Sequence, residues 1–312
     1  MQATGVHAVA AALIRMRSLL FVPGDSAKKL DKSLESGADV LIVDLEDSVG
    51  PSRKPEARAS ALAFLTRLNT AKERPAVYVR VNALDTGLTD EDLQGVIAGC
   101  PDGILLPKAE GGGSVVHLDA KLTTLEAIHG LADGAIGIIA LTTETPAALF
   151  QNGSYGGTSL RLRALTWGAE DLSVGLGAET NRDSQGRFTD PYRLARTLCL
   201  AGAGAAGVPA LDTVFVDYRD EAGLRTEAEE ARRDGFTGKL AIHPAQVPII
   251  NAVFTPTPEA VAHARDLVAA FAADPDAGVI GIGGKMYDRP HLVRAERLLA
   301  RAKLAAARSA RP

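Results

Sequence analysis

Two carboxylates in this 312-residue sequence stand just beyond short apolar runs. Glu144 follows the run 135–141, and Asp171 follows the run 162–167 after a small-residue turn. Carboxylate oxygens without a nearby histidine or cysteine favour Mg²⁺, or alternatively Mn²⁺, over zinc. If the two runs are neighbouring strands, the sequence predicts that Glu144 and Asp171 share one divalent cation.

Each acid also has a plainer interpretation that the sequence leaves open. Glu144 could cap a helix that begins at Pro146, because an acidic side chain there can accept hydrogen bonds from free backbone N–H groups. Asp171 and its neighbour Glu170 could be solvated acids of a loop. Position along the chain alone does not decide between ligand and loop acid.

Arg80 ends an otherwise apolar run at 76–81. A guanidinium in such a place needs an anionic partner, and a bidentate grip on a substrate carboxylate would provide one. A structural salt bridge to Asp44 or Glu46 would satisfy it equally well. Lys108, which follows a proline, could contact the same anion or form an internal ion pair.

Polar residues follow seven of the apolar runs, and this coincidence carries more weight than any single residue. Acids facing basic residues around one site indicate a divalent cation together with an anionic substrate. The further residues at these positions are Asp44, Glu46, Asp47, Asn82, Lys108, Asp217 and His243.

The elements that must position these side chains are short apolar runs alternating with helix-like segments, which is typical of βα units around a parallel sheet. Eight parallel strands of this kind close into a TIM barrel of about 250 residues, with its active site at the C-terminal ends of the strands. We therefore predict a (β/α)8 barrel. The expected strands are 18–22, 40–43, 76–81, 103–106, 135–141, 162–167, 213–216 and 239–242.

Helix signals fall between these runs. Ser26 is expected to cap a helix that reaches Ser36, and the segment 53–68 places Ala57, Ala61, Leu62, Leu65 and Leu68 on one face. Asp190 before a proline is a favourable helix start.

Three domains are expected along the chain. Residues 1–16 form an extension, residues 17–255 the barrel, and residues 256–312 a C-terminal helical arm that packs on a neighbouring subunit. The boundary rests on the Thr-Pro-Thr-Pro cluster at 255–258, a strong helix breaker. The arm is expected to contain an Ala-rich helix, a glycine-rich loop over 278–291 and a basic final helix.

Two glycine motifs are decoys. The G-x-G-x-x-G at 202–207 follows a helix and precedes a strand, the reverse of the order in a dinucleotide-binding fold, so we predict a helix end. The segment 281–285 lacks the spacing of a phosphate-binding loop. A flexible loop there could still carry Asp288 to another surface.

The composition limits the partners. A formal net charge of −4 provides no global reason to bind nucleic acid or an anionic membrane. Two distant cysteines, Cys100 and Cys199, form neither a disulfide framework nor a zinc pattern. The first residues lack the basic region of a signal peptide, and no apolar stretch reaches about 18 residues, so a cytoplasmic location is expected.

Eight blocks of the sequence, in order along the chain, stand out: RSLLFVPGDSAKKL (17–30), ADVLIVDLEDSV (38–49), VYVRVN (77–82), LLPKAE (105–110), TTETPAAL (142–149), WGAEDLSVGLG (167–177), LAIHPAQV (240–247) and GKMYDRPH (284–291). Together they resemble the citrate lyase β-subunit-like enzymes of the HpcH/HpaI aldolase superfamily, which include malyl-CoA and citramalyl-CoA lyases. The similarity covers nearly the whole chain after residue 16.

The resemblance implies roles for individual residues. Glu144 and Asp171 match the Mg²⁺ ligands of the family, and Arg80 matches the arginine that holds the carboxylate of the keto acid. Asp288 matches the aspartate of a C-terminal arm that reaches into a neighbouring subunit as acid or base. A homotrimer or hexamer is therefore expected.

Further positions match groups around the metal and the CoA end of the family site. Glu46 and Asp47 would orient metal-bound water. Phe21 replaces a tyrosine that is frequent in the family, so a hydroxyl contact is absent. The positions that align with the CoA end are Phe21, Lys28, Lys32, Arg53, Lys54, Ile242 and His243, of which the Lys and Arg residues could meet phosphates.

The implied activity is an Mg²⁺-dependent carbon–carbon lyase. It would cleave or form a 3-hydroxy-acid CoA thioester, such as malyl-, methylmalyl- or citramalyl-CoA, with an α-keto acid and an acyl-CoA as the other partners. Three alternatives remain open: a citrate lyase β subunit acting on a citryl thioester, a malyl-CoA thioesterase, and a metal-dependent aldolase acting on free hydroxy-keto acids. A non-catalytic subunit of a larger lyase would bind these ligands without turnover.

Overall fold

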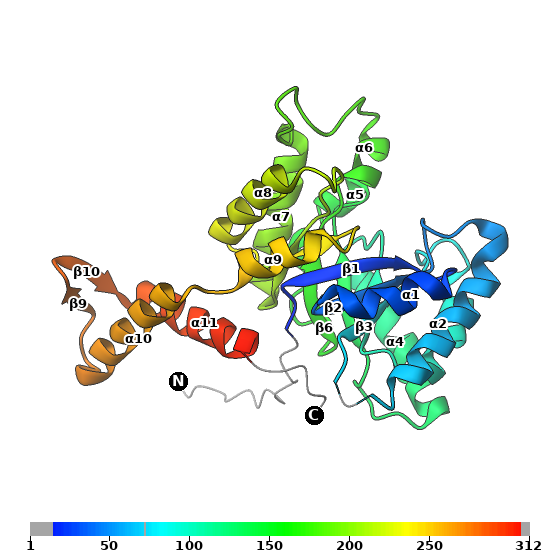
Figure 1. Cartoon of the computed structure of the whole chain (residues 1–312), viewed down its shortest axis with the longest axis horizontal. Coiled ribbons are helices and arrows are strands. Elements are labelled where there is room, and N and C mark those ends of the chain that lie inside the picture. Colours follow the sequence, from blue (N-terminus) through cyan, green and yellow to red (C-terminus); the bar gives the residue numbers. More distant parts are fainter. Residues whose placement is uncertain (1–14, 72, 307–312) are drawn as a thin grey trace. The chain divides into compact units, whose positions relative to one another are not determined.

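The computed structural model describes residues 15–71 and 73–306 of the chain. These residues divide into two compact units, one formed by residues 16–254 and one that begins at Thr255. Apart from Arg15 and Met16, the extension predicted for residues 1–16 lies outside the described residues. Each unit is described by itself (Figure 1).

The first unit is a closed barrel of eight parallel strands in the order β1 to β8, which confirms the predicted (β/α)8 fold (Figure 1). Every strand pairs with its sequence neighbour, and β8 pairs with β1 to close the sheet. The strands are β1 Ser18–Pro23, β2 Val40–Asp44, β3 Ala76–Arg80, β4 Gly103–Leu106, β5 Gly137–Leu141, β6 Leu162–Thr166, β7 Ala210–Asp212 and β8 Gly238–Ala241.

The seventh strand differs from the prediction. It spans Ala210–Asp212, whereas the predicted run 213–216 lies in the loop that follows. Strand β7 must pair with β6 and β8, and its partners Leu165 and Gly238 set the register at Ala210 and Leu211. The apolar residues of the run are explained by packing outside the sheet, since Phe215 contacts the core from the loop. Asp217 is consequently an exposed loop residue beyond the strand end.

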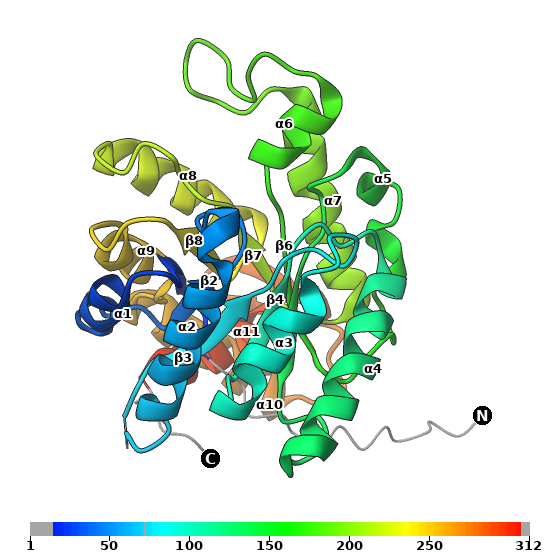
Figure 2. The same ribbon diagram turned by 90° about the vertical axis from the view of Figure 1, so that its right-hand side faces the viewer.

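Helices surround the strands, and Figure 2 shows α6 and the loop after it projecting beyond the other barrel helices. The helices of this unit are α1 Ala27–Ser33, α2 Lys54–Leu68, α3 Thr89–Val96, α4 Gly112–His129, α5 Pro146–Leu149, α6 Glu170–Leu176, α7 Asp190–Ala206, α8 Glu221–Asp234 and α9 Gln246–Phe254. Short 3-10 turns are η1 Leu34–Ser36, η2 Pro51–Arg53, η3 Ile97–Gly99 and η4 Asn152–Ser154.

The helix predictions hold with local corrections. Ser26 stands at the cap of α1 but its side chain makes no capping hydrogen bond. In α2 the buried face includes Phe64, while the predicted Leu62 is only half-buried. Thr189, with extended backbone, is the cap of α7, and Asp190 is its first residue. The G-x-G-x-x-G segment falls at the end of α7, as predicted.

The second unit contains two helices and a hairpin. Helices α10 Pro258–Ala273 and α11 Arg289–Ala306 flank strands β9 Val279–Ile282 and β10 Lys285–Asp288. The predicted loop is therefore wrong in part, because its two halves pair antiparallel. Gly283 and Gly284 take φ values of 57° and 76°, which suit a tight two-residue hairpin turn. No helix in the described part of the chain is long and apolar enough to cross a bilayer.

A buried ionic network joins the last three strands. The Asp212 carboxylate accepts hydrogen bonds from Lys239 Nζ at 2.8 Å, Trp167 Nε1 at 2.8 Å and Arg196 Nε at 3.1 Å. Burial alone would raise the pKa of Asp212, but Lys239 and Arg196 hold it below its ordinary value. Lys239 also donates to Glu227 Oε1 at 2.9 Å. The network therefore fixes the end of β6, just before the loop that carries Asp171.

Removing one member of this network should destabilise the fold. The substitution Asp212→Ala leaves the fully buried Lys239 ammonium with Glu227 as its remaining carboxylate. We expect the free energy of unfolding to fall by about 3–5 kcal/mol, as for other buried pairs deprived of one partner. Urea denaturation followed by circular dichroism measures this loss. Arg67→Ala, which breaks an exposed pair with Asp31, should change stability by less than about 1 kcal/mol. Equal effects of the two substitutions would contradict the role of the network.

Candidate active site

A cavity of about 410 Å³ opens at the C-terminal ends of the strands. Seven candidate residues predicted from the sequence line it, so the folded chain brings them together: Phe21, Asp44, Asp47, Arg80, Glu144, Asp171 and Ile242. The other lining residues are Pro23, Ser48, Leu141, Trp167, Gly168, Ala169, Glu170, Thr213, Val214 and Leu240. An apolar wall with a few convergent charged groups is typical of a small-molecule site.

Glu144 follows β5 and is 5% exposed. Its Oε2 accepts the backbone N–H of Lys108 at 2.6 Å. Thr145, not Glu144, caps α5, so the capping interpretation is wrong. Gly168 leaves the space that the carboxylate fills, because a Cβ at that glycine would lie 2.9 Å from Glu144 Cγ. Burial first, and then Asp171 and Glu46, raise the pKa of Glu144 to about 8.

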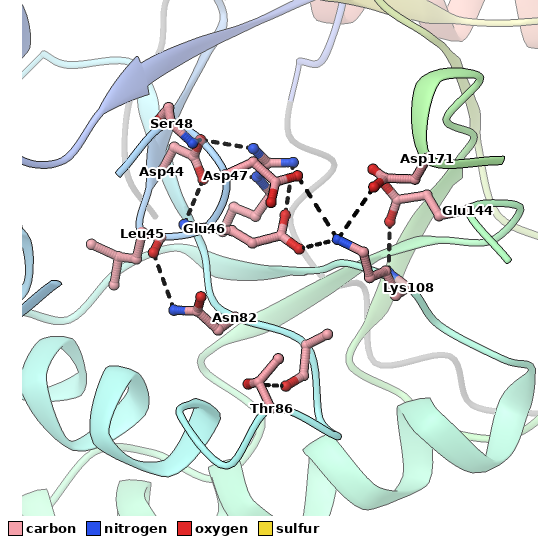
Figure 3. A network of polar contacts seen from close by, with 12 residues as sticks. Asp44, Leu45, Glu46, Asp47, Ser48, Asn82, Thr86, Lys108, Glu144 and Asp171 are labelled. Atoms are coloured by element: carbon pink, nitrogen blue, oxygen red, sulfur yellow. Dashed lines mark hydrogen bonds and ion pairs between the residues drawn. The ribbon is translucent and has the colours of Figure 1, made fainter. Parts of the chain in front are cut away.

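Asp171 lies in the first turn of α6 and its side chain is 34% exposed. Figure 3 shows its carboxylate beside that of Glu144, on the same side of Lys108. The adjacent Glu170 also borders the cavity, but its Oε1 accepts a hydrogen bond from Asn181 at 2.8 Å. The two neighbouring acids thus have different surroundings, and it is Asp171 that faces Glu144.

Arg80 ends β3 with its guanidinium held by acids of β2 and the loop after it. Nε and Nη2 bind the two oxygens of Asp44 at 2.8 and 2.7 Å, and Nη1 lies 2.9 Å from Glu46 Oε2. The salt-bridge interpretation is therefore confirmed for both acids. The Phe21 ring centroid lies 4.8 Å from the guanidinium carbon. Arg80 also lines the cavity, which leaves a contact with a substrate carboxylate compatible with this geometry.

Lys108 forms the internal ion pair that the sequence predicted as one of its roles. Its Nζ lies 2.5 Å from Glu46 Oε1, 3.6 Å from Asp171 Oδ1 and 3.8 Å from Asp47 Oδ2 (Figure 3). Burial raises the pKa of Glu46 above its ordinary value, against the opposing effect of Arg80 and Lys108. The ion pairs of this part of the site involve four carboxylates, of Asp44, Glu46, Asp47 and Asp171, and two basic side chains, Arg80 and Lys108.

The residues present fit a divalent cation. Within the described ranges no three His, Cys, Asp or Glu side chains form a metal-binding cluster, so the protein would supply two carboxylates, from Glu144 and Asp171. Mg²⁺ commonly binds through one or two carboxylates and keeps its other positions for water and substrate oxygens. Burial and the acids Asp171 and Glu46 raise the pKa of Glu144 in spite of the nearby Lys108 ammonium, so the positive charge of the protein leaves this carboxylate incompletely balanced. A bound cation would supply the missing positive charge.

The positions predicted for the CoA end do not all lie where a phosphate could reach them. Lys28 and Lys32 are exposed residues of α1, and Arg53 is exposed but pairs with Asp25 and Glu56.

The prediction for Lys54 needs correction. Its side chain is buried, and Nζ donates to the carbonyl oxygens of Leu45 and Glu46 at 2.8 and 3.0 Å. The ammonium thereby braces the loop after β2 from inside, which explains why it is withdrawn from the phosphate-accessible surface.

Two other positions lie at the loop after β8. Ile242 is 40% exposed and lines the cavity. His243 stacks on Tyr218, with ring centroids 4.5 Å apart. Tyr218 was missed by sequence reasoning, because its place beside His243 depends on β7 ending at Asp212 and on the loop that occupies the predicted strand 213–216.

The apolar wall was also missed. Trp167 and Val214 line the cavity, although both sit in segments read as strand interior. Trp167 is fully buried, and its indole packs on Phe188 and bonds Asp212, so no local signal in the sequence marked it as a cavity residue. Asn82, in contrast, is scaffold, because its Nδ2 bonds Asp92 and the Leu45 carbonyl.

Asp288 belongs to the second unit and ends β10. Its carboxylate contacts the imidazole of His291, which holds the pKa of Asp288 below its ordinary value. The side chain is half-exposed. Its predicted action in a neighbouring subunit stays a prediction.

Family models match most of the chain. Residues 17–244 match the HpcH/HpaI aldolase/citrate lyase family, and residues 195–306 match a carbon–carbon bond lyase family of the TIM-barrel fold.

Curated relatives agree. Citrate lyase subunit beta of Escherichia coli K12 is 35% identical over 294 residues, covering 94% of this chain and 95% of that protein. Mitochondrial citramalyl-CoA lyase of Mus musculus is 31% identical over 296 residues, covering 91% and 85%.

Solved structures agree as well. The protein CitE from Mycobacterium tuberculosis, in complex with magnesium, acetoacetate and coenzyme A, has a TM-score of 0.72 at 32% identity, covering 92% of this chain and 97% of that one. The citrate lyase beta subunit from the same organism, with oxaloacetate and magnesium, has a TM-score of 0.65 at 32% identity, covering 77% and 97%. The chain belongs to the HpcH/HpaI aldolase/citrate lyase family and is a carbon–carbon lyase of its citrate lyase β group.

Proposed function

We propose that this lyase uses Mg²⁺ to cleave or form a 3-hydroxy-acid CoA thioester such as malyl-, methylmalyl- or citramalyl-CoA, with an α-keto acid and an acyl-CoA as the other partners. The observation that carries the proposal is the buried Glu144 carboxylate facing Asp171 in the same cavity as Arg80. Relatives bound to magnesium with acetoacetate and coenzyme A, or with oxaloacetate, support it.

Glu144 and Asp171 are the residues that would hold the cation; Mn²⁺ satisfies the same oxygen donors. When bound, Mg²⁺ supplies a Lewis acid that acidifies the substrate hydroxyl and stabilises the keto acid formed from it. Glu46 and Asp47 pair with Lys108, which also lies near Asp171, and from there they would orient water at the site.

Arg80 would hold the carboxylate of the keto acid. Its guanidinium is already clamped by Asp44 and Glu46, so binding costs little side-chain entropy. A fixed charge aimed at the substrate carboxylate keeps the breaking carbon–carbon bond in one orientation. The Phe21 ring that packs on the guanidinium restricts it further.

Asp288 is proposed as the acid or base at the acyl-CoA carbon. It would protonate the thioester enolate after cleavage, or remove that proton in the condensing direction. In this proposal the protein is a trimer or hexamer, and the C-terminal arm of residues 256–312 carries the Asp288 carboxylate into the site of a neighbouring subunit. Lys28, Lys32 and Arg53 are the basic residues proposed to meet the CoA phosphates, with Ile242 and His243 at the same end. A cytoplasmic location completes the proposal.

Replacing Asp171 with alanine should affect turnover far more than replacing its neighbour Glu170. Asp171→Ala should lower Mg²⁺-dependent turnover at least about 100-fold, because losing a ligand forfeits several kcal/mol of charge stabilisation. Steady-state release of keto acid measures it. Glu170→Ala is the matched control and should retain most of the activity, because its carboxylate bonds Asn181. Near wild-type turnover in Asp171→Ala would remove Asp171 from the metal site.

A substrate panel tests the reaction itself. Purified protein with Mg²⁺ and malyl-, methylmalyl-, citramalyl- and citryl-CoA should release an α-keto acid and an acyl-CoA from at least one ester. Chelation with EDTA should abolish that release. Chromatography of the products separates the alternatives, since free CoA with malate marks a thioesterase and cleavage of a free hydroxy-keto acid marks an aldolase. No keto acid from any ester would defeat the lyase proposal.

Shared sites predict complementation between inactive chains. Asp171→Ala and Asp288→Asn should each be inactive alone. Co-expression should recover part of the activity, because a mixed oligomer contains some sites with an intact barrel and an intact arm from different chains. Turnover of the co-purified mixture measures this recovery. Persistent inactivity of verified mixed oligomers would show that Asp288 does not act across subunits.

A further inference from the structure

Lys108 has an unusual backbone conformation for its residue type. Its φ is +50°, and among the described residues only Cys100 shares a positive φ without being glycine. The left-handed conformation costs a side chain about 1–2 kcal/mol, because Cβ crowds the following carbonyl oxygen. Glycine would adopt the same turn without this cost. Strain of this kind persists where the surrounding structure holds the residue, which points to a use for the Lys108 side chain.

The backbone of this residue already has a task. The N–H of Lys108 donates to Glu144 Oε2 at 2.6 Å, and the N–H of Ala109 donates to the Leu141 carbonyl at 3.0 Å. The first bond fixes one oxygen of Glu144. Any residue except proline could make it, so it does not explain the lysine.

The side chain places a positive charge between the acids of the cavity. Nζ lies 2.5 Å from Glu46 Oε1 on one side and 3.6 Å from Asp171 Oδ1 on the other (Figure 3). Burial lowers the pKa of Lys108, but Glu46, Glu144 and Asp171 raise it above its ordinary value, so the ammonium remains charged. The lysine therefore acts electrostatically on both carboxylates of the proposed metal pair.

The neighbouring cation cannot take over this task. The guanidinium of Arg80 is bound to Asp44 and Glu46, and the described part of the chain shows no ion pair between it and Asp171. Lys108 is the base that faces Asp171 there. The charge of Asp171 is therefore balanced by the Lys108 ammonium, although this ammonium lies closer to Glu46 than to Asp171.

We propose that Lys108 is an internal counter-ion of the metal site: its ammonium balances Asp171 and Glu46 before a divalent cation binds, and stays on Glu46 afterwards. The proposal rests on the proposed function only in taking Glu144 and Asp171 as the ligands. Like charges a few Å apart in a partly buried site repel strongly. The ammonium thus weakens cation binding while keeping the acids in place in the metal-free protein. Lys108 is thus a positioning residue, and removal of its charge should strengthen cation binding.

The test measures binding of Mn²⁺ alone, by electron paramagnetic resonance of the free ion. Lys108→Met should bind Mn²⁺ roughly tenfold more tightly than the wild type, equivalent to about 1.4 kcal/mol. General damage to the site would instead weaken binding, so the sign separates the two causes. Lys108→Gly, which relieves the backbone strain and keeps the N–H, should show the same gain if the Met variant folds poorly. Lys108→Arg, which keeps the positive charge, should bind Mn²⁺ with the affinity of the wild type.

A matched control removes the same charge elsewhere. Lys121→Met breaks an exposed pair with Asp90 outside the cavity and should leave Mn²⁺ affinity unchanged. Unchanged or weaker binding in both Lys108→Met and Lys108→Gly would overturn the counter-ion role and leave the metal site standing. Absence of Mn²⁺ binding by the wild type would overturn both the counter-ion and the proposed metal ligands.

Discussion

The concentration of carboxylates at the barrel mouth is the constraint on which the site depends. Burial and mutual repulsion raise the pKa values of Glu144 and Glu46, and two basic side chains hold the group together. Arg80 clamps the acids of β2, and Lys108 bridges toward Asp171. A divalent cation bound between these carboxylates would relieve their mutual repulsion.

Buried polar contacts elsewhere in the barrel hold the strand ends and loops that carry these carboxylates. Asp212 binds Trp167 and Lys239, which holds the end of β6 next to its neighbours. Lys54 braces the loop that carries Glu46 through two carbonyl oxygens. A charged side chain that the sequence predicted to meet the substrate, Lys54, therefore has a structural role instead. Small residues complete the arrangement, since Gly168 leaves the space that Glu144 occupies.

Membership of the citrate lyase β group agrees with the composition of the site, but members of this group differ in their acyl substrates. The curated relatives include a citrate lyase subunit and a citramalyl-CoA lyase at similar identity. Such substrates differ by one methyl or one carboxylate group, and a methyl difference is worth only about 1–3 kcal/mol in an apolar pocket. Trp167, Val214 and Leu240 form the apolar wall of the cavity.

The sequence alone determined the barrel and the position of most site residues, because apolar runs of strand length and the acids after them are local signals. It could place Glu144 and Asp171 just beyond the ends of two adjacent strands, since neighbouring strands in the chain are neighbours in the sheet. Only the tertiary structure decided the partners. The pairing of Arg80 with both Asp44 and Glu46, the burial of Lys54 and the short β7 depend on register and side-chain direction. Those are set by packing between segments far apart in sequence, which no local pattern encodes.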